Sequence, residues 1–235
     1  LKAKFKVFSK TLLDYQLTFF DEKYPIGNPI IIPFNLNSGL VAFYPFNGNA
    51  NDEINGNNGT VYGGALLTTD RKGNANRAYS FDGVDDYIEV TNSFPGLLGI
   101  NGSKSVSMWV KSNNNSSYPL YIQNGGSVFC LISEKNAVGN FIYDNTFFTS
   151  ANFVFLNIPS LNNWVHLVLV KYDDGNTNFT KIYANNIELK LDPTSLSLAP
   201  PDCSNPLLSK PWFGRSCELF HNGSIDDIRI YNRAL

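Results

Sequence analysis

Short segments of this chain alternate between hydrophobic and polar residues, which is the pattern of a β-strand with one buried face. In the segment 105–111, Val106, Met108 and Val110 fall on one side and Trp109 on the other. Comparable segments lie at 40–46, 78–81, 86–90, 128–133, 139–143, 164–172, 179–184, 187–191 and 224–231. Since no segment keeps an apolar period near 3.6 over three turns, substantial helix is not expected.

Turn residues separate these segments. Asp82-Gly83 stands between the strands expected at 78–81 and 86–90. Asp173-Asp174-Gly175 and Asn185-Asn186 separate later strands in the same way. Many short strands joined by close turns indicate an all-β fold, a two-sheet antiparallel β-sandwich or jelly roll.

Residues 1–38 form a separate part of the chain. Phe5 and Val7, and then Tyr15, Leu17 and Phe19, alternate with polar residues, which predicts two short strands. We therefore predict an N-terminal β-hairpin extension over 1–38, packed on a sandwich that spans 39–235. The tail of a preceding domain is the alternative interpretation of residues 1–38.

The composition supports strands and narrows the range of partners. Hydrophobic residues make up 43% of the 235 and charged residues 16%, and the 18 Phe and 12 Tyr suit half-buried, pleated surfaces. A net charge of −2 gives no electrostatic reason to expect nucleic acid as a partner. No apolar run reaches the length of a membrane span, so no span is expected.

The chain has three cysteines, Cys130, Cys203 and Cys217. Cys203 and Cys217 lie close together in a loop that contains prolines, and a disulfide between them would fit an oxidising compartment. Free cysteines are an equally ordinary interpretation.

Several motifs resemble those of the laminin G-like, concanavalin A-like jelly-roll family. The stretches 39–52, 55–61 and 78–88 resemble the opening of such domains, and 107–110 and 164–168 look like two of their central strands. The C-terminal stretch 225–235, IDDIRIYNRAL, is the most specific signature. The resemblance runs from about residue 39 to the end, with the motifs in the family's order.

The resemblance implies two antiparallel sheets stacked face to face. Domains of this family are commonly appended to secreted bacterial enzymes and adhesins, so a secreted or cell-surface location is expected. Many of them bind carbohydrate, and others mediate protein contacts or act as spacers. Fold alone therefore does not fix the function.

A calcium site is predicted between an early loop and the last strand. Asp52 and Asn57 lie in the early loop, residues 47–58, which is rich in side-chain and backbone oxygens. Asp226 and Asp227 lie in the last strand. Calcium takes six to eight oxygen ligands, which these two segments could supply. Strand alternation places Asp226 on the face of Ile228, which should be the core face, where an unpaired carboxylate is unfavourable. The family resemblance also implies a structural calcium at this place.

These residues also have an interpretation without metal. Asp226 could cap backbone amides or pair with Arg77 or Arg229, and Asp52 could be a solvated turn residue. A melting temperature that depends on a chelator would distinguish the two interpretations.

A second acidic group consists of Asp82, Asp85 and Asp86. Asp before Gly is a standard hairpin pair, so turn chemistry accounts for Asp82. A second metal or a ligand contact is the alternative.

The candidate carbohydrate-binding residues are aromatic, because an aromatic ring stacks on the apolar face of a sugar. Trp212, in the loop flanked by cysteines, is predicted as an exposed platform, and Tyr118 and Tyr121 are further candidates. The alternative for all three is that a large apolar ring anchors a loop. Trp109 and Trp164 match interior strands of the family and are predicted to pack in the core.

No catalytic site is predicted, so the chain is not expected to be an enzyme. Retaining glycosidases need two carboxyl groups about 5–5.5 Å apart, and no strand carries acidic residues spaced for this. The mid-strand His166 is predicted as a core histidine, and His221 has no partner near it in the sequence. The sequence also contains no Gly-x-Ser-x-Gly elbow and no phosphate-binding glycine loop.

The sequence thus predicts a non-catalytic, extracellular carbohydrate-binding or adhesion module stabilised by a structural calcium. Its expected partner is a glycan or polysaccharide, together with other protein domains of the parent chain. The alternative is a structural or protein-interaction spacer of a larger secreted protein. A polysaccharide hydrolase or lyase ranks below both.

Overall fold

The computed structural model describes residues 4–8, 15–20, 31–91, 94, 102–114, 116–124, 127–134, 140–145, 153–155, 162–188, 210–216 and 219–235. Within these ranges the chain forms β-strands and turns, and no helix there could cross a membrane. The chain divides into two compact units, Leu1–Leu40 and Val41–Leu235.

The first unit is a small antiparallel sheet in the order β1-β2-β3. Its strands are β1 (Lys4–Phe8), β2 (Tyr15–Phe20) and β3 (Ile31–Phe34). The two strands expected from the alternating pattern are therefore present, and a third strand, which was not predicted, pairs with β2. Packing of this unit on the sandwich stays a prediction.

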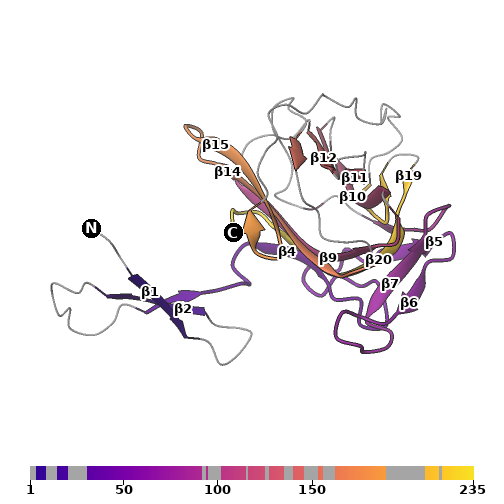
Figure 1. The fold of residues 1–235 in the computed structure, drawn as a ribbon, viewed down its shortest axis with the longest axis horizontal. Helices are drawn as coiled ribbons and strands as arrows, with labels where there is room; N and C mark the ends of the chain where they lie inside the picture. Colours follow the sequence, from indigo (N-terminus) through magenta and orange to yellow (C-terminus); the bar gives the residue numbers. More distant parts are fainter. Residues whose placement is uncertain are drawn as a thin grey trace. The chain divides into compact units, whose positions relative to one another are not determined.

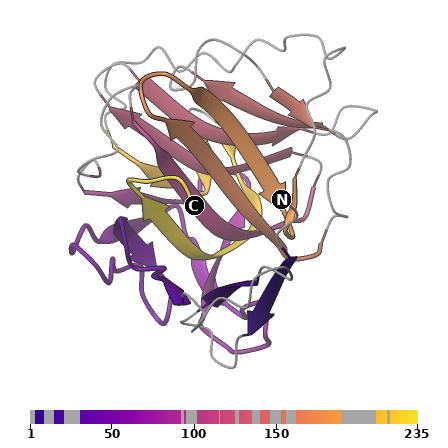
Figure 2. The same ribbon diagram turned by 90° about the vertical axis from the view of Figure 1, so that its left-hand side faces the viewer.

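The second unit is built on two antiparallel sheets, as predicted. One has the order β16-β15-β14-β9-β20-β7-β6, with β4 also paired to β20. Its strands are β4 (Leu40–Tyr44), β6 (Leu66–Thr68), β7 (Ala78–Asp82), β9 (Lys104–Ser112), β14 (Val165–Asp173), β15 (Asn178–Ala184), β16 (Ile187–Glu188) and β20 (Asn222–Tyr231). We call it the eight-stranded sheet; β14, β9 and β20 run side by side in Figure 1, and the β14–β15 hairpin (orange) is seen face-on in Figure 2.

The other, seven-stranded sheet has the order β13-β12-β11-β10-β17-β8-β5. Its strands are β5 (Gly59–Tyr62), β8 (Tyr87–Val90), β10 (Ser116–Asn124), β11 (Ser127–Glu134), β12 (Asn140–Asn145), β13 (Phe153–Phe155) and β17 (Trp212–Phe213). A two-stranded ribbon, β18 (Arg215–Ser216) with β19 (Leu219–Phe220), connects β17 to β20.

Each of the ten strand segments expected in the sandwich corresponds to an observed strand. The turns at 173–175 and 185–186 connect β14, β15 and β16, as predicted. The short strands β5, β6, β13, β17, β18 and β19 and the longer β10 were not among those expected. Cys130 lies on β11, whereas Cys203 and Cys217 lie outside the described residues, so their disulfide stays a prediction.

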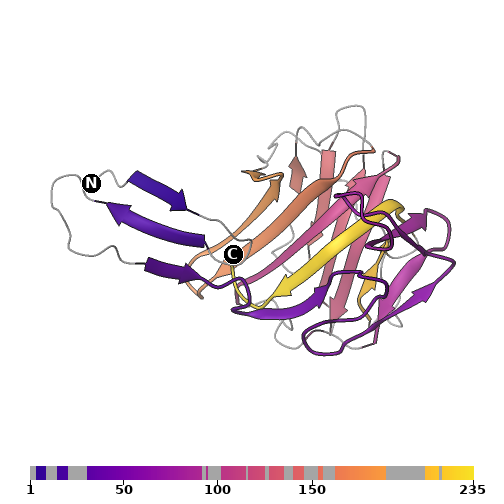
Figure 3. The ribbon, with the colours of Figure 1, turned by 90° about the horizontal axis from the view of Figure 1, so that it is seen from below.

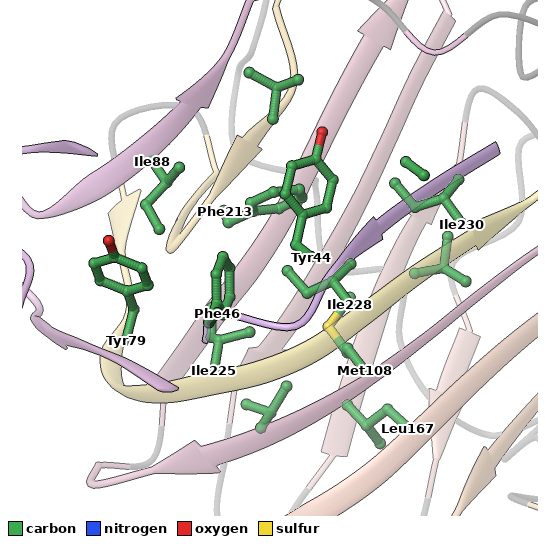
Figure 4. Close-up of a cluster of buried hydrophobic side chains, with 14 of the residues drawn as sticks. Tyr44, Phe46, Tyr79, Ile88, Met108, Leu167, Phe213, Ile225, Ile228 and Ile230 are labelled. Atoms are coloured by element: carbon green, nitrogen blue, oxygen red, sulfur yellow. The ribbon is translucent and has the colours of Figure 1, made fainter. Parts of the chain in front are cut away.

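The core lies between the two sheets and is rich in aromatic rings. Figure 4 shows Tyr44, Phe46 and Phe213 gathered above Ile225 and Ile228 of β20. Tyr44 and Phe213 meet edge to face with ring centroids 4.8 Å apart. Such contacts add to the stabilisation that burial of apolar area provides.

A bulge interrupts the closing strand β20, which lies between β9 and β7 (Figure 3). Asp226 is opposite Trp109, but Arg229 is opposite Ser107, so β20 has one residue more than β9 between these pairs. Asp227 takes up the extra residue with a positive φ of 50°. Such a bulge changes which face the following side chains occupy.

The bulge corrects the predicted orientation of Asp226. Ile228 and Ile230 point into the core, but Asp226 shares the outward face with Trp109. Simple alternation counted back from Ile228 assigned Asp226 to the core face, because it did not include the extra residue.

His221, between β19 and β20, is fully buried. Burial lowers the pKa of His221 to about 4, so the folded state keeps this ring neutral where the unfolded chain takes up a proton. Lowering the pH from about 7 to about 4 should therefore reduce the free energy of unfolding by up to about 3 kcal/mol. Urea titrations of the wild type and His221→Gln test this, because the variant should lose that part of the pH dependence. An equal pH dependence in both proteins would contradict it.

Candidate functional site

The predicted loop ligand Asp52 is a buried acceptor of backbone hydrogen bonds. Its Oδ1 accepts from the N–H groups of Phe43 (2.9 Å) and Ile54 (3.0 Å). Its Oδ2 accepts from those of Asn55 and Asn57, both at 3.2 Å. Asp52 is only 6% exposed, so the alternative of a solvated turn residue is wrong. This carboxylate organises the loop between β4 and β5.

Asn57 belongs to the same buried network. Besides donating to Asp52, it accepts a hydrogen bond at its backbone carbonyl from the Tyr44 hydroxyl, at 2.6 Å. The loop is thereby tied to the core by Tyr44.

The predicted strand ligands Asp226 and Asp227 both pair with Arg71. Arg71 Nη1 lies 2.5 Å from Asp226 Oδ2, and Nη2 lies 2.6 Å from Asp227 Oδ2. Burial and the neighbouring Asp227 raise the pKa of Asp226 to about 6, while Arg71 opposes the shift. An ion-pair partner was foreseen for Asp226, but Arg77 and Arg229 were the candidates and Arg71 was missed.

The described side chains do not fit the predicted calcium site. The oxygens of Asp52 face N–H donors, and those of Asp226 and Asp227 face a guanidinium, which a calcium ion would have to displace. These three carboxylates also do not gather within 4.8 Å of one another. Calcium binding between this loop and the last strand therefore stays a prediction, and it would require these side chains to exchange their present partners for the ion.

Asp82, Asp85 and Asp86 do gather, and among the described residues they are the one group of three or more such side chains with ligand atoms within 4.8 Å of one another. Asp82 Oδ1 accepts from the Val84 N–H (2.8 Å), and Asp86 Oδ2 accepts from the Asp82 N–H (2.8 Å). These bonds confirm the turn chemistry. Burial, with Asp82 and Asp85 nearby, raises the pKa of Asp86.

Trp212 lies on the outward face of the seven-stranded sheet. It is opposite Glu89, whereas its neighbour Phe213 is opposite Ile88 in the core. Because side chains alternate along strands, Trp212, Glu89 and Tyr87 share the face turned away from the core. The next strand continues this face with Tyr62, which is opposite Tyr87.

Trp212 is nevertheless only 4% exposed, so its prediction as an exposed platform needs correction. The Arg215 guanidinium lies over the ring, 4.3 Å from its centroid. The same guanidinium lies 5.1 Å from the Tyr87 centroid and 5.0 Å from that of Phe220. Arg215 reaches this position from the β18–β19 ribbon, three residues after Trp212.

The accessible part of this face is a stacked tyrosine pair with charged neighbours. The Tyr62 and Tyr87 rings are nearly parallel, at 11°, with centroids 4.9 Å apart, and Tyr62 is 41% exposed. Lys210 Nζ donates to Glu89 Oε1 at 2.5 Å, and Trp212 Nε1 donates to Glu89 Oε2 at 3.3 Å. Glu89, together with the nearby Tyr62 and Tyr87, raises the pKa of Lys210.

We call this region the Tyr62 surface. It comprises Tyr62, Tyr87, Glu89, Lys210, Arg215 and Phe220, with Trp212 beneath Arg215. An apolar stack bordered by a carboxylate, an ammonium and a guanidinium offers what a sugar needs, which is a ring to stack on and hydrogen-bonding groups for its hydroxyls.

Of the three predicted aromatic residues, the register brings two together. Tyr121 of β10 is opposite Trp212 of β17, so both belong to one row across the sheet. Tyr118 falls where the β10–β11 register is irregular, just before Pro119. The side chains of Tyr118 and Tyr121 lie outside the described residues, and their role in binding stays a prediction.

Sequence reasoning missed Tyr62, Tyr87, Glu89 and Arg215. The alternation within 86–90 places Tyr87 and Glu89 on the face opposite Ile88, and this signal was present in the sequence but was not used. The sequence gives no corresponding signal that β17 lies beside β8.

Trp109 and His166 do not lie in the core, which corrects both predictions. They are half-buried on the outward face of the eight-stranded sheet and stack with centroids 4.9 Å apart. The His166 ring is satisfied by Ser107, whose Oγ lies 2.8 Å from Nε2. Trp164 is likewise half-buried, with Lys111 5.5 Å from its ring. Leu167 and Met108 supply the core side chains of these strands instead.

Comparison with protein families gives a match over residues 82–235 to a laminin G-type family described as the concanavalin A-like lectin/glucanases superfamily. The match begins at Asp82, the last residue of β7, and includes the strands from β8 to β20. No curated protein matches the chain.

Solved structures share the fold at low sequence identity. Domain 4 of AbnA, an extracellular GH43 arabinanase from Geobacillus stearothermophilus solved with arabinotriose, superposes with a TM-score of 0.58 and 20% identity, covering 84% of this chain and 94% of that one. The binding domain of botulinum neurotoxin serotype D superposes with a TM-score of 0.54 and 17% identity, covering 85% of this chain and 49% of that one. At these identities the likeness shows the fold.

Proposed function

Because the chain belongs to the concanavalin A-like lectin/glucanase superfamily, we propose that it is a non-catalytic carbohydrate-binding module that holds its ligand on the Tyr62 surface. The observation that supports this most is the stacked Tyr62–Tyr87 pair, of which Tyr62 is exposed, bordered by Glu89 and Lys210. The proposed setting is extracellular, as in the arabinanase whose domain shares the fold. Calcium is not part of the proposal, since Arg71 already pairs with Asp226 and Asp227.

The Tyr62 surface is preferred over a second aromatic pair for a physical reason. Tyr172 and Phe179 also stack, with centroids 5.1 Å apart, and Phe179 is 42% exposed. They lie at the β14–β15 hairpin, with Lys181 5.9 Å from the Phe179 ring. The Tyr62 surface combines its stack with a carboxylate and two cations, which gives more groups to orient a ligand.

Replacing Tyr62 with alanine should weaken glycan binding by roughly 30-fold or more, because the ring is the accessible half of the stack. Isothermal titration against a panel of soluble polysaccharides measures this, with arabino-oligosaccharides first because a protein of this fold was solved with one. Tyr87→Ala should have a similar effect.

Phe179→Ala is the matched control, since it removes an equally exposed stacked ring from the other sheet. It should leave affinity unchanged. A loss confined to Phe179→Ala would move the site to the β14–β15 hairpin. Binding to no glycan in the panel would contradict the proposal and favour a spacer. Reducing-end assays on each bound polysaccharide test the non-catalytic part, which turnover would contradict.

A further inference from the structure

Arg71 bridges two adjacent carboxylates on the closing strand. Its two terminal nitrogens lie 2.5 and 2.6 Å from oxygens of Asp226 and Asp227. The side chains of Arg71, Asp226 and Asp227 are 17%, 3% and 16% exposed, so the three groups are largely withdrawn from water. The charge-assisted hydrogen bonds are short, as expected for guanidinium and carboxylate.

Two kinds of contact position Arg71. Hydrogen bonds fix the turn that carries it, and its guanidinium packs against the Trp109 ring. Asp70 Oδ1 accepts from the N–H groups of Lys72 and Asn74, both at 2.8 Å. The guanidinium itself lies 4.7 Å from the Trp109 centroid, and the Trp109 ring stacks on His166. Arg71 is therefore positioned by its own turn and by a ring of β9, independently of the carboxylates.

The bulge in β20 creates the need for a counter-charge. Neighbouring residues of a regular strand point to opposite faces, but the positive φ of Asp227 brings its carboxylate to the same guanidinium as Asp226. Two largely buried carboxylates that contact the same guanidinium repel each other unless a cation lies between them. Among the ion pairs of the described residues, Arg229 pairs with Asp227 alone, with its nitrogen 3.5 Å away and its guanidinium over Phe43, so Arg71 is the cation that bridges both carboxylates.

We propose that Arg71 is the resident counter-ion of the Asp226–Asp227 pair and takes the position in which a divalent cation would otherwise neutralise it. The closing strand is then stable without a divalent cation. Removal of Arg71 turns the two carboxylates into a site that a divalent cation can occupy, because carboxylate oxygens are the ligands that calcium prefers.

Thermal unfolding of the full chain in EDTA and in calcium chloride tests this. The wild type should melt at the same temperature in both. Arg71→Gln should melt about 10 °C lower in EDTA, since it leaves two largely buried carboxylates without the cation that bridges them, and calcium should recover part of the loss. Arg77→Gln, in an exposed position of the same loop, is the matched control and should behave as the wild type.

Three results would overturn the proposal. They are a wild type that loses stability in EDTA, an Arg71→Gln variant as stable as the wild type, and a destabilised variant that calcium does not recover. Should Arg71→Gln fail to fold, the triple variant Arg71→Gln/Asp226→Asn/Asp227→Asn decides. It removes both carboxylate charges that Arg71 neutralises and should fold again with no response to calcium, whereas a triple variant that also fails to fold would contradict the counter-ion role.

Discussion

Replacing Asp52 with alanine is expected to destabilise the sandwich by about 4 kcal/mol, because four backbone N–H groups lose their acceptor together. These donors belong to Phe43, Ile54, Asn55 and Asn57, and the carboxylate that binds them is buried. Water cannot easily replace it there, so the loop should lose its conformation. Equilibrium urea denaturation measures the change.

Asp174→Ala is the control for this prediction. Asp174 accepts N–H bonds from Asn176 (2.9 Å) and Thr177 (2.7 Å) in the exposed β14–β15 turn, where water can take its place. Its loss should be within about 1 kcal/mol. Equal losses for the two variants would show that the buried network around Asp52 is not what holds the loop.

Gly223→Ala is expected to cost at least about 3 kcal/mol, for a reason of space rather than of lost bonds. A Cβ at this position would lie 2.0 Å from the backbone carbonyl oxygen of Lys111 and 2.7 Å from Nε2 of His221. Gly223 pairs with Ser112, so the clash falls inside the ladder between β20 and β9. The backbone of two central strands would have to move apart.

Gly73→Ala separates crowding from backbone strain. Gly73 has a φ of +89°, but a Cβ there meets nothing within 4 Å. Only the left-handed backbone conformation is then penalised, by about 1–2 kcal/mol. Urea midpoints of the two variants give the comparison. A Gly223→Ala variant no less stable than Gly73→Ala would contradict the close packing at β20.

The sequence predicted the sandwich well, because strand alternation and turn residues are local signals. Val106, Met108 and Val110 marked the inward face of β9, and each of them is in the core. The bulge at Asp227 left no such signal, since a residue with positive φ other than glycine has no fixed sequence pattern.

The candidate site was harder to predict, because its parts come from distant segments. Trp212 stood out in the sequence, but its cover by Arg215 depends on how the β18–β19 ribbon folds back. Tyr62 and Lys210 are far apart along the chain and are brought together by the β5-β8-β17 register. The partner of Asp226 was missed for the same reason, since 155 positions separate it from Arg71.

The most direct test of the central claim is a crystal structure of the chain with the oligosaccharide that binds best in the panel. A sugar ring should lie against the Tyr62–Tyr87 pair, with hydroxyls within hydrogen-bond distance of Glu89 or Lys210. A sugar bound anywhere else, such as against Tyr172 and Phe179, would contradict the account.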